Sequence, residues 1–339
     1  MVQISILIDN NSNSGQLKAD YLDNDTKGVV NNSNCVLLSD NSIVYEPNDE
    51  LKISKNELLK EHGLSIFINK DDKEHFIIDM GASNKYRFNA LKMNIDLSTI
   101  DFAVVSHGHS DHIGGLSDFL ENFKGLPVYL SKEIASHNYF STRHNNILKN
   151  IGNSHDIIND NADRIKQIDA NCFISNDVAL IFNKFNSYSK PHANKYLYSN
   201  SCLNNKKTNY DNGFSVNDSE LSLDSFNHEI TIAIIDNDSL IIVSPCSHNG
   251  IINIINSCID FTGIKKIKAF IGGLHLIDDD SLETKKNIEN LSKTLNSLYP
   301  DLSLFTGHCT GENAFQILNN CKSTINIENL FSGKTFSID

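Results

Sequence analysis

Short apolar runs bounded by turn residues recur along this chain and predict buried β-strands. The predicted strands are Ile4–Ile8, Leu64–Ile68, Phe76–Ile78, Ala103–Val105, Val128–Leu130, Phe173–Phe182, Ile267–Ile271, Leu302–Phe305 and Thr335–Ile338. Glu229–Ile235 and Ser239–Ser244 flank Asp236-Asn237-Asp238 and predict a β-hairpin. Apolar residues at helical spacing predict helices at Tyr86–Met93, Ile113–Phe123, Ile251–Phe261, Leu282–Leu298 and Ala314–Leu318.

Strands that alternate with helices predict a layered α/β domain with its site at strand ends. Two Asn-rich stretches, near 11–56 and 183–226, show little hydrophobic periodicity. We predict that both are insertions in a single domain spanning residues 1–339. Within the first stretch, Cys35–Leu38 and Ile43–Tyr45 suggest a small hairpin. The segment Ser131–Ala170 is polar and predicts weakly helical structure.

A dense group of candidate metal ligands follows the strand predicted at Ala103–Val105. Residues 106–115 read Ser-His-Gly-His-Ser-Asp-His-Ile-Gly-Gly, and imidazoles and carboxylates are ligands that zinc prefers. His107 and His109 are two residues apart, so in an extended loop they point to the same side. Asp111 and His112 then turn towards a second position. The alternative is that these histidines bind no metal. That interpretation would be favoured for a single isolated histidine, but not for this cluster.

This cluster resembles the H-x-H-x-D-H motif of the metallo-β-lactamase superfamily, which follows a buried strand. The resemblance implies a four-layer αββα sandwich that holds a pair of zinc, iron or manganese ions. It also implies that His107 and His109 bind one ion, and that Asp111 and His112 bind the other. Asp79-Met80-Gly81 resembles the family's early Asp-x-Gly motif, in which the aspartate supports the metal-binding loop. The alternative is that Asp79 is an ordinary turn residue before Gly81.

Three further histidines follow strands predicted in the C-terminal half, namely His248, His275 and His308. We expect His248 and His308 to complete the ligand set. For His275, substrate contact or support of a ligand is favoured over ligation. Cys246 and Cys309 adjoin these histidines, and packed small residues are favoured there over thiolate ligands.

A longer set of motifs resembles one branch of this superfamily, the dihydropterin–ribofuranosylaminobenzene 5′-phosphate synthases. The motifs are Glu61-His62-Gly63-Leu64-Ser65, Asp79-Met80-Gly81, Asn89-Ala90, Ser106–Gly115, Cys246-Ser247-His248-Asn249-Gly250-Ile251, Gly272-Gly273-Leu274-His275-Leu276 and His308-Cys309-Thr310-Gly311-Glu312. The resemblance implies a transferase of a methanopterin-type pathway, which joins a dihydropterin methyl diphosphate to a ribofuranosylaminobenzene 5′-phosphate and releases diphosphate. The alternatives are a dinuclear metal-dependent hydrolase of a phosphodiester, lactone or other ester, and a non-catalytic metal-binding module.

The same resemblance suggests roles for individual residues. Asp111 and His275 are the expected catalytic residues, and His62, His275 and Glu312 are the candidates for substrate binding. For Glu312, a cap of the helix after His308 is favoured over contact with substrate. Two divalent metal ions are expected, with zinc favoured over iron or manganese. The aspartate that usually bridges the metals is replaced by the Cys246-Ser247-His248 segment, which leaves the bridging group open, with a solvent hydroxide as one candidate.

The charge and the cysteines of the chain indicate which partners and which cellular setting to expect. The chain has 29 basic and 42 acidic residues, a formal charge of −13, which disfavours nucleic-acid binding. A small phosphorylated substrate remains compatible, because bound metal ions invert the local potential. Seven cysteines without a C-x-x-C pair favour a reducing, cytoplasmic setting. No apolar run approaches the roughly 20 residues that cross a membrane, so no membrane partner is expected. A homo-oligomer is possible on this sequence.

Overall fold

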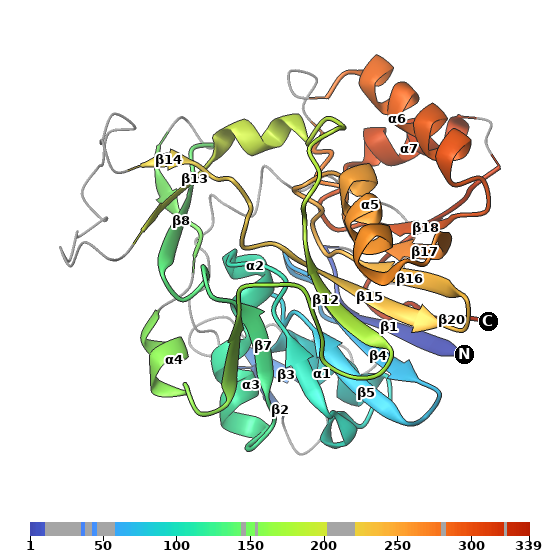
Figure 1. The fold of residues 1–339 in the computed structure, drawn as a ribbon. Coiled ribbons are helices and arrows are strands. Elements are labelled where there is room, and N and C mark those ends of the chain that lie inside the picture. Colours follow the sequence, from blue (N-terminus) through green and yellow to red (C-terminus); the bar gives the residue numbers. More distant parts are fainter. Residues whose placement is uncertain are drawn as a thin grey trace.

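The computed structural model describes residues 1–10, 35–37, 43–45, 58–143, 147–152, 155–201, 221–278, 283–321 and 324–339. Two seven-stranded sheets face each other, and helices cover their outer faces (Figure 1). The two chain ends lie side by side, because the first strand pairs with the last.

The first sheet has the strand order β10-β7-β6-β5-β4-β1-β20. Its strands are β1 (Val2–Ile8), β4 (Ser65–Lys70), β5 (Glu74–Ile78), β6 (Phe102–Val104), β7 (Val128–Ser131), β10 (Ile165–Ile168) and β20 (Thr335–Ile338). Neighbouring strands from β5 to β10 in this order pair in parallel.

The second sheet has the order β11-β12-β15-β16-β17-β18-β19. Its strands are β11 (Cys172–Phe173), β12 (Val178–Phe182), β15 (Ile230–Asp236), β16 (Ser239–Val243), β17 (Lys266–Ile271), β18 (Ser303–Thr306) and β19 (Asn326–Asn329). The hairpin predicted from the Asp-Asn-Asp turn is present as β15 and β16. From β16 to β19 the strands pair in parallel.

Helices lie on both outer faces of the sandwich (Figure 1). They are α1 (Lys85–Lys92), α2 (Ser110–Ile113), α3 (Leu116–Asn122), α4 (His155–Asp160), α5 (Ile251–Thr262), α6 (Lys285–Leu298) and α7 (Glu312–Asn320), with short 3₁₀ turns at η1 (Leu97–Thr99) and η2 (His192–Tyr196). The helix predicted from Leu282 begins at Lys285, because the Thr284 side chain caps it by accepting the Asn287 N–H.

Three apolar clusters hold the layers together. The central one joins residues of both sheets, such as Ile66 and Ile232. A second packs α5, α6 and α7 on the second sheet, and a third packs α1 and α3 on the first. The order of layers is therefore helix, sheet, sheet, helix, which confirms the predicted αββα sandwich.

Two stretches differ from their predicted local structure. The segment Ser131–Ala170, expected to be weakly helical, contains the helix α4 but also the strands β8 (His137–Ser141), β9 (Lys149–Asn150) and β10. The stretch 183–226, expected to be irregular, contains η2, β13 (Leu197–Ser201) and β14 (Ser222–Leu223), while 202–220 lie outside the described residues. β8 pairs with β13 in a separate four-stranded sheet, so partners distant in sequence stabilise strands with weak local patterns.

The first Asn-rich stretch lies outside the described residues except for β2 (Cys35–Leu37) and β3 (Ile43–Tyr45). These two strands pair as an antiparallel hairpin, at the place where the sequence suggested one. The organisation as one domain with two insertions remains a prediction. Among the described helices, none combines the length and apolar character that a membrane span requires.

Candidate metal centre

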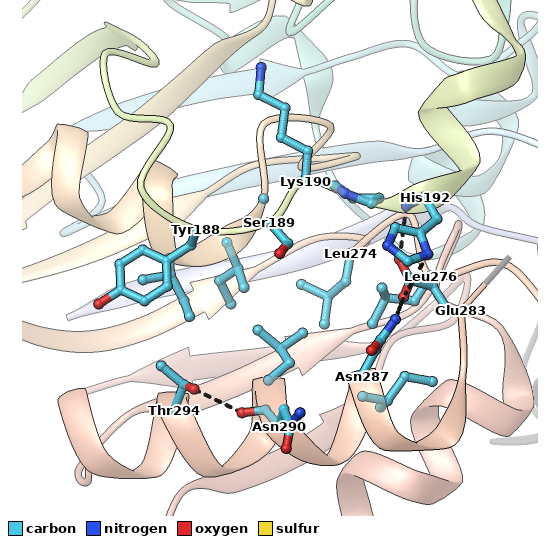
Figure 2. Close-up of a pocket in the computed structure, with 16 residues that line it drawn as sticks. Tyr188, Ser189, Lys190, His192, Leu274, Leu276, Glu283, Asn287, Asn290 and Thr294 are labelled. Carbon is cyan, nitrogen blue, oxygen red and sulfur yellow. Dashed lines mark hydrogen bonds and ion pairs between the residues drawn. The ribbon is translucent and has the colours of Figure 1, made fainter.

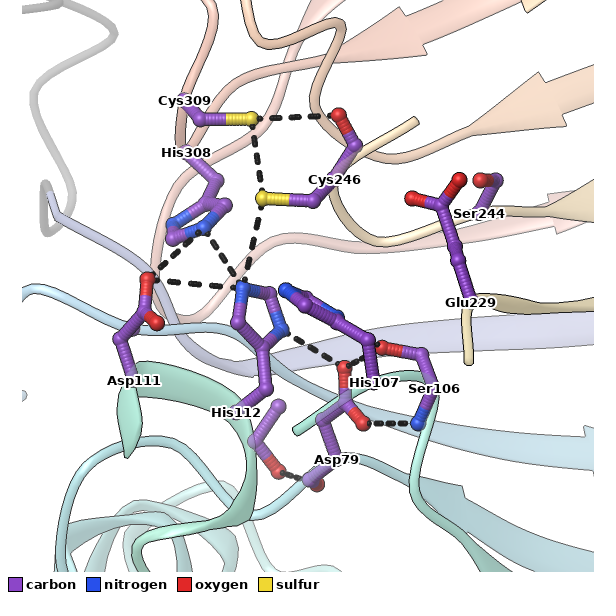
Figure 3. Close-up of polar contacts among 12 residues, drawn as sticks. Asp79, Ser106, His107, Asp111, His112, Glu229, Ser244, Cys246, His308 and Cys309 are labelled. Atoms are coloured by element: carbon purple, nitrogen blue, oxygen red, sulfur yellow. Dashed lines mark hydrogen bonds and ion pairs between the residues drawn. The ribbon is translucent and has the colours of Figure 1, made fainter. Parts of the chain in front are cut away.

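Loops from both sheets converge at one edge of the sandwich. Parallel strands carry the residues that follow them to the same edge, so β5 and β6 supply loops from one sheet, and β16, β17 and β18 from the other. Figure 3 shows side chains from four of these loops pointing towards one another, among them His107, His112, Cys246 and His308. The predicted ligands, far apart in sequence, are thus neighbours in space.

The first donor group consists of His107, His109 and His248. One ring nitrogen from each lies within 4.8 Å of the others. The Nε2 atom of each ring is buried and has no hydrogen-bond partner within the described part of the chain. Buried polar atoms normally have a partner, so three such nitrogens facing one another fit a metal ion.

Burial keeps these imidazoles neutral, as metal binding requires. Burial, together with neighbouring histidines, holds the pKa of His107 and of His248 well below its usual value. Burial also lowers the pKa of His109 to about 4.

Hydrogen bonds orient two of these rings from behind. Ser106 Oγ lies 2.8 Å from His107 Nδ1, and Asn194 Oδ1 lies 3.2 Å from His248 Nδ1. The buried Glu229 carboxylate accepts the backbone N–H groups of His248 at 2.7 Å and of Asn249 at 2.9 Å. Burial raises the pKa of Glu229, although these donors oppose the shift. Glu229 therefore holds the loop that carries His248.

The second donor group consists of Asp111, His112 and His308. His112 Nε2 lies 3.0 Å from His308 Nε2, and Asp111 Oδ2 lies 3.5 Å from each of these nitrogens. Ligands of a tetrahedral zinc ion at about 2.0–2.1 Å are roughly 3.4 Å apart. The spacing of this group thus also fits a metal ion.

The ionisation of the second group is coupled. Burial alone would raise the pKa of Asp111, but His112 holds it well below its usual value. Burial likewise opposes the protonated form of His112, yet the Asp111 and Asp79 carboxylates raise its pKa to about 10. For His308, burial and the neighbouring His112 hold the pKa well below its usual value.

The backbone is strained where several of these residues leave their strands. Asp79, Ser247, His275 and His308 have φ values of 57°, 57°, 49° and 50°. Non-glycine residues in this left-handed region cost on the order of 1–3 kcal/mol each, and they cluster at functional sites. Tertiary contacts hold one of these turns, since Asp9 Oδ2 accepts the His308 N–H at 3.1 Å.

Two thiols also lie inside this cluster, where the sequence favoured small packed residues. Cys246 and Cys309 are both buried, and their Sγ atoms are 3.4 Å apart. Cys246 Sγ also lies 3.5 Å from His112 Nε2. Burial and Cys309 raise the pKa of the Cys246 thiol well above its usual value in the metal-free protein.

Sequence reasoning missed a buried acid–base pair behind His109. His228 Nε2 lies 3.1 Å from Asp224 Oδ2, and His228 Nδ1 accepts the Gly108 N–H at 3.2 Å. The ring of Tyr139 packs on His228 at 4.3 Å and lies so close to Gly108 that a Cβ there would be 2.3 Å from it. Asp224, His228 and Glu229 are polar residues just before a buried strand, which was the available signal.

The three predicted substrate-binding residues occupy different environments. His62, with 43% of its side chain exposed, stacks on His308 and places Nε2 3.4 Å from Asp111 Oδ2. His275 is buried 4.2 Å from the ring of His248, and neither of its ring nitrogens has a hydrogen-bond partner among the described residues. Burial and Arg143 hold its pKa well below its usual value. Glu312 is half-buried in the first turn of α7.

Two cavities flank the cluster. The larger, of about 370 Å³, lies between the 188–192 segment, α5 and α6 (Figure 2). Leu274 and Leu276 line it, whereas His275 belongs to the metal-binding groups, so this loop separates the cavity from the donor atoms. A polar cavity of about 310 Å³ is lined by Tyr139 and His228, whose ring centres lie 5.8 and 5.9 Å from that of His109.

Comparison with known proteins supports the same fold. The metallo-beta-lactamase superfamily model matches residues 60–169. The chain is 27% identical over 296 residues to the 7,8-dihydropterin-6-methyl-4-(beta-D-ribofuranosyl)-aminobenzene-5′-phosphate synthase of Methanocaldococcus jannaschii, covering 81% of this chain and 91% of that protein. A stretch of 42 residues, 12% of this chain, is 40% identical to the anaerobic nitric oxide reductase flavorubredoxin of Aliivibrio salmonicida, 8% of whose length it covers.

Among solved structures, a metal-dependent hydrolase of the β-lactamase superfamily aligns over 100% of both chains with a TM-score of 0.67 and 21% identity. The fold is therefore that of the metallo-β-lactamases. The resemblance to this superfamily and to its synthase branch is confirmed. The synthase is an enzyme that aligns over most of the chain, which supports an enzyme here as well.

Proposed function

We propose that this chain, with its metallo-β-lactamase fold, is a two-metal transferase that joins a dihydropterin methyl diphosphate to a ribofuranosylaminobenzene 5′-phosphate. The observation that carries the proposal is the pair of facing donor groups at one sheet edge. The match to the synthase from Methanocaldococcus jannaschii, which extends over 81% of the chain, supports the choice of substrates.

The proposed ligands follow the two donor groups. His107, His109 and His248 bind one divalent ion, and Asp111, His112 and His308 bind the other. Zinc suits these imidazole-rich groups, while iron and manganese are the alternatives. Bound there, such a pair would neutralise the charge that develops on a departing diphosphate.

Side chains around the donor groups then have distinct tasks. In the proposed reaction the arylamine bonds to the pterin methylene carbon, the bond from that carbon to diphosphate breaks, and the arylamine releases a proton. His275 is buried beside His248, and neither of its ring nitrogens has a hydrogen-bond partner among the described residues, so its imidazole is the proposed acceptor of that proton. His62 is exposed beside Asp111 and is proposed to orient a substrate. Glu312 is proposed as a further substrate contact.

A second candidate is a dinuclear metal-dependent hydrolase of a phosphodiester, lactone or other ester. The observation that favours it is the Asp111 carboxylate, which is ionised and lies beside both His112 and His308. Such a carboxylate can accept a hydrogen bond from an attacking water and orient it.

Metal content and turnover, measured on one sample, test both candidates. Protein purified without added metal is expected to hold about two metal ions per chain. It should release diphosphate only when the pterin and the arylamine are both supplied. Single-substrate hydrolysis of a phosphodiester or lactone would favour the hydrolase, and failure to take up metal on titration would overturn both.

A double variant tests the ligands themselves. His107→Ala with His109→Ala should lose the first ion and all turnover, because two of three donors are removed. His192→Ala is the matched control, since this exposed imidazole belongs to neither donor group. Stoichiometric metal in the purified double variant would contradict the assignment.

A further inference from the structure

We propose that the thiolate of Cys246 is itself a metal ligand, placed between the two donor groups. The inference rests on the proposed two-metal centre and deepens it. It replaces the interpretation of Cys246 as a small packed residue.

The position of the sulfur atom carries this inference. Cys246 Sγ lies within 4.8 Å of donor atoms of His107 and His112, which belong to different groups. Cys246 Sγ also lies within 4.8 Å of donor atoms of His248 and His275, and of donor atoms of His308 and Cys309. The sulfur therefore borders both groups, as a ligand shared by or placed between two ions would.

The spacing matches coordination chemistry. A tetrahedral ion with a nitrogen at about 2.0–2.1 Å and a sulfur at about 2.3 Å holds these two ligands roughly 3.5 Å apart. Cys246 Sγ lies 3.5 Å from His112 Nε2. His112 Nδ1 is already engaged by Asp79 Oδ2 at 2.7 Å, so the nitrogen facing the sulfur is the one available to a metal.

The neighbouring thiol has a different set of contacts. Cys309 Sγ accepts the backbone N–H of His275 at 3.2 Å and donates to the carbonyl oxygen of Cys246 at 3.5 Å. It also lies against Gly273, where an added Cβ would be 2.3 Å from the sulfur. Cys309 thus holds two loops together, and Cys246 presents its sulfur to the imidazoles.

A thiolate in the centre changes the metal preference. Soft sulfur ligands select zinc or iron, whereas manganese and magnesium prefer oxygen. We therefore expect the protein to retain zinc, or cobalt in its place, and to exchange manganese readily.

Cobalt substitution provides the test. Wild-type protein loaded with Co²⁺ is expected to show a near-ultraviolet sulfur-to-cobalt charge-transfer band. Cys246→Ser should lose this band while keeping the visible cobalt bands of the histidine ligands. Cys309→Ser, the matched control 3.4 Å away, should keep it. A band that survives in Cys246→Ser, or disappears only in Cys309→Ser, would overturn the assignment.

X-ray absorption of zinc-loaded wild-type protein removes any dependence on how the variants fold. A sulfur scatterer at about 2.3 Å is expected, and its absence would refute the inference. The outcome is separable from the proposed function. A sulfur signal without pterin transfer would defeat only the proposed reaction, and pterin transfer without a sulfur signal would defeat only the thiolate ligand.

Discussion

Asp79 Oδ2 lies 2.7 Å from His112 Nδ1, and both side chains are completely buried. The same carboxylate accepts the Ser106 hydroxyl at 2.6 Å and the Ser106 backbone N–H at 2.7 Å. The imidazole is thereby turned so that Nε2 faces Asp111 and His308. A carboxylate behind a histidine in this way orients a metal ligand and increases its basicity.

Replacing this carboxylate should weaken metal binding and the fold together. Asp79→Ala is expected to lower metal affinity about 10–100-fold, and to reduce the free energy of unfolding by about 3–5 kcal/mol because it breaks the buried Asp79–His112 pair. Competitive chelator titration and denaturant unfolding measure the two effects. Asp118→Ala is the control, since Asp118 pairs with Arg87 away from the site. It should lose stability without losing metal affinity, and unchanged affinity in Asp79→Ala would contradict the supporting role.

Two neighbouring histidines should separate metal binding from turnover. The rings of His248 and His275 are 4.2 Å apart, but only His248 belongs to the first donor group. His248→Ala is expected to retain about one metal ion per chain. His275→Ala should keep both ions and lose about 10²–10⁴-fold in turnover, as expected for removal of a proton acceptor. Elemental analysis with kinetics distinguishes the two, and metal loss in His275→Ala would instead make His275 a ligand.

Two glycines with positive φ should respond differently to alanine. Gly272 has φ 137°, and a Cβ there would lie 2.0 Å from the Ser244 carbonyl oxygen. Gly263 has φ 75° at the end of α5, with open space around it. We expect Gly272→Ala to cost about 3 kcal/mol or more, and Gly263→Ala about 1–2 kcal/mol. Denaturant unfolding measures both, and equal losses would show that the crowding at Ser244 is relieved without cost.

The metal-free protein should be most stable near neutral pH, because two histidines shift in opposite directions. Burial lowers the pKa of His109 to about 4, whereas Asp111 and Asp79 overcome burial and raise that of His112 to about 10. The unfolded chain protonates both near pH 6.5. Between about pH 6.5 and about pH 4 the unfolded chain binds a proton at His109 and the folded chain does not. The free energy of unfolding therefore falls as the pH is lowered through this range. Between about pH 6.5 and about pH 10 the unfolded chain has lost the proton of His112 and the folded chain keeps it. The free energy of unfolding therefore falls as the pH is raised through this range.

Each of these histidines changes the free energy of unfolding by at most about 1.4 kcal/mol per pH unit. Chelator-treated protein unfolded by denaturant at a series of pH values measures the curve. His109→Gln should lessen the loss on the acid side, to which the other buried histidines of lowered pKa also contribute. His112→Gln should flatten the alkaline side. A stability that changes in one direction only across this range would disprove the opposing shifts.

The local pattern of residues was enough to predict most strands and helices and the main candidate ligands. Ala103–Val105 ends in the histidine cluster, and the hairpin turn Asp236-Asn237-Asp238 precedes the loop of His248. These signals are local, because a buried strand, a turn and a ligand motif each occupy a short run of residues. The same reasoning failed at β8, a short strand that depends on pairing with β13 about 60 residues later.

Only the tertiary structure decided which atoms meet. His112 and His308 are 196 residues apart, yet their Nε2 atoms are 3.0 Å apart because parallel strands of two sheets end at the same edge. The support of His248 by Glu229, and the placement of Cys246 beside His112, depend on that edge as well. Sequence spacing identifies residues able to bind metal, but the packing of the two sheets determines which of them face one another.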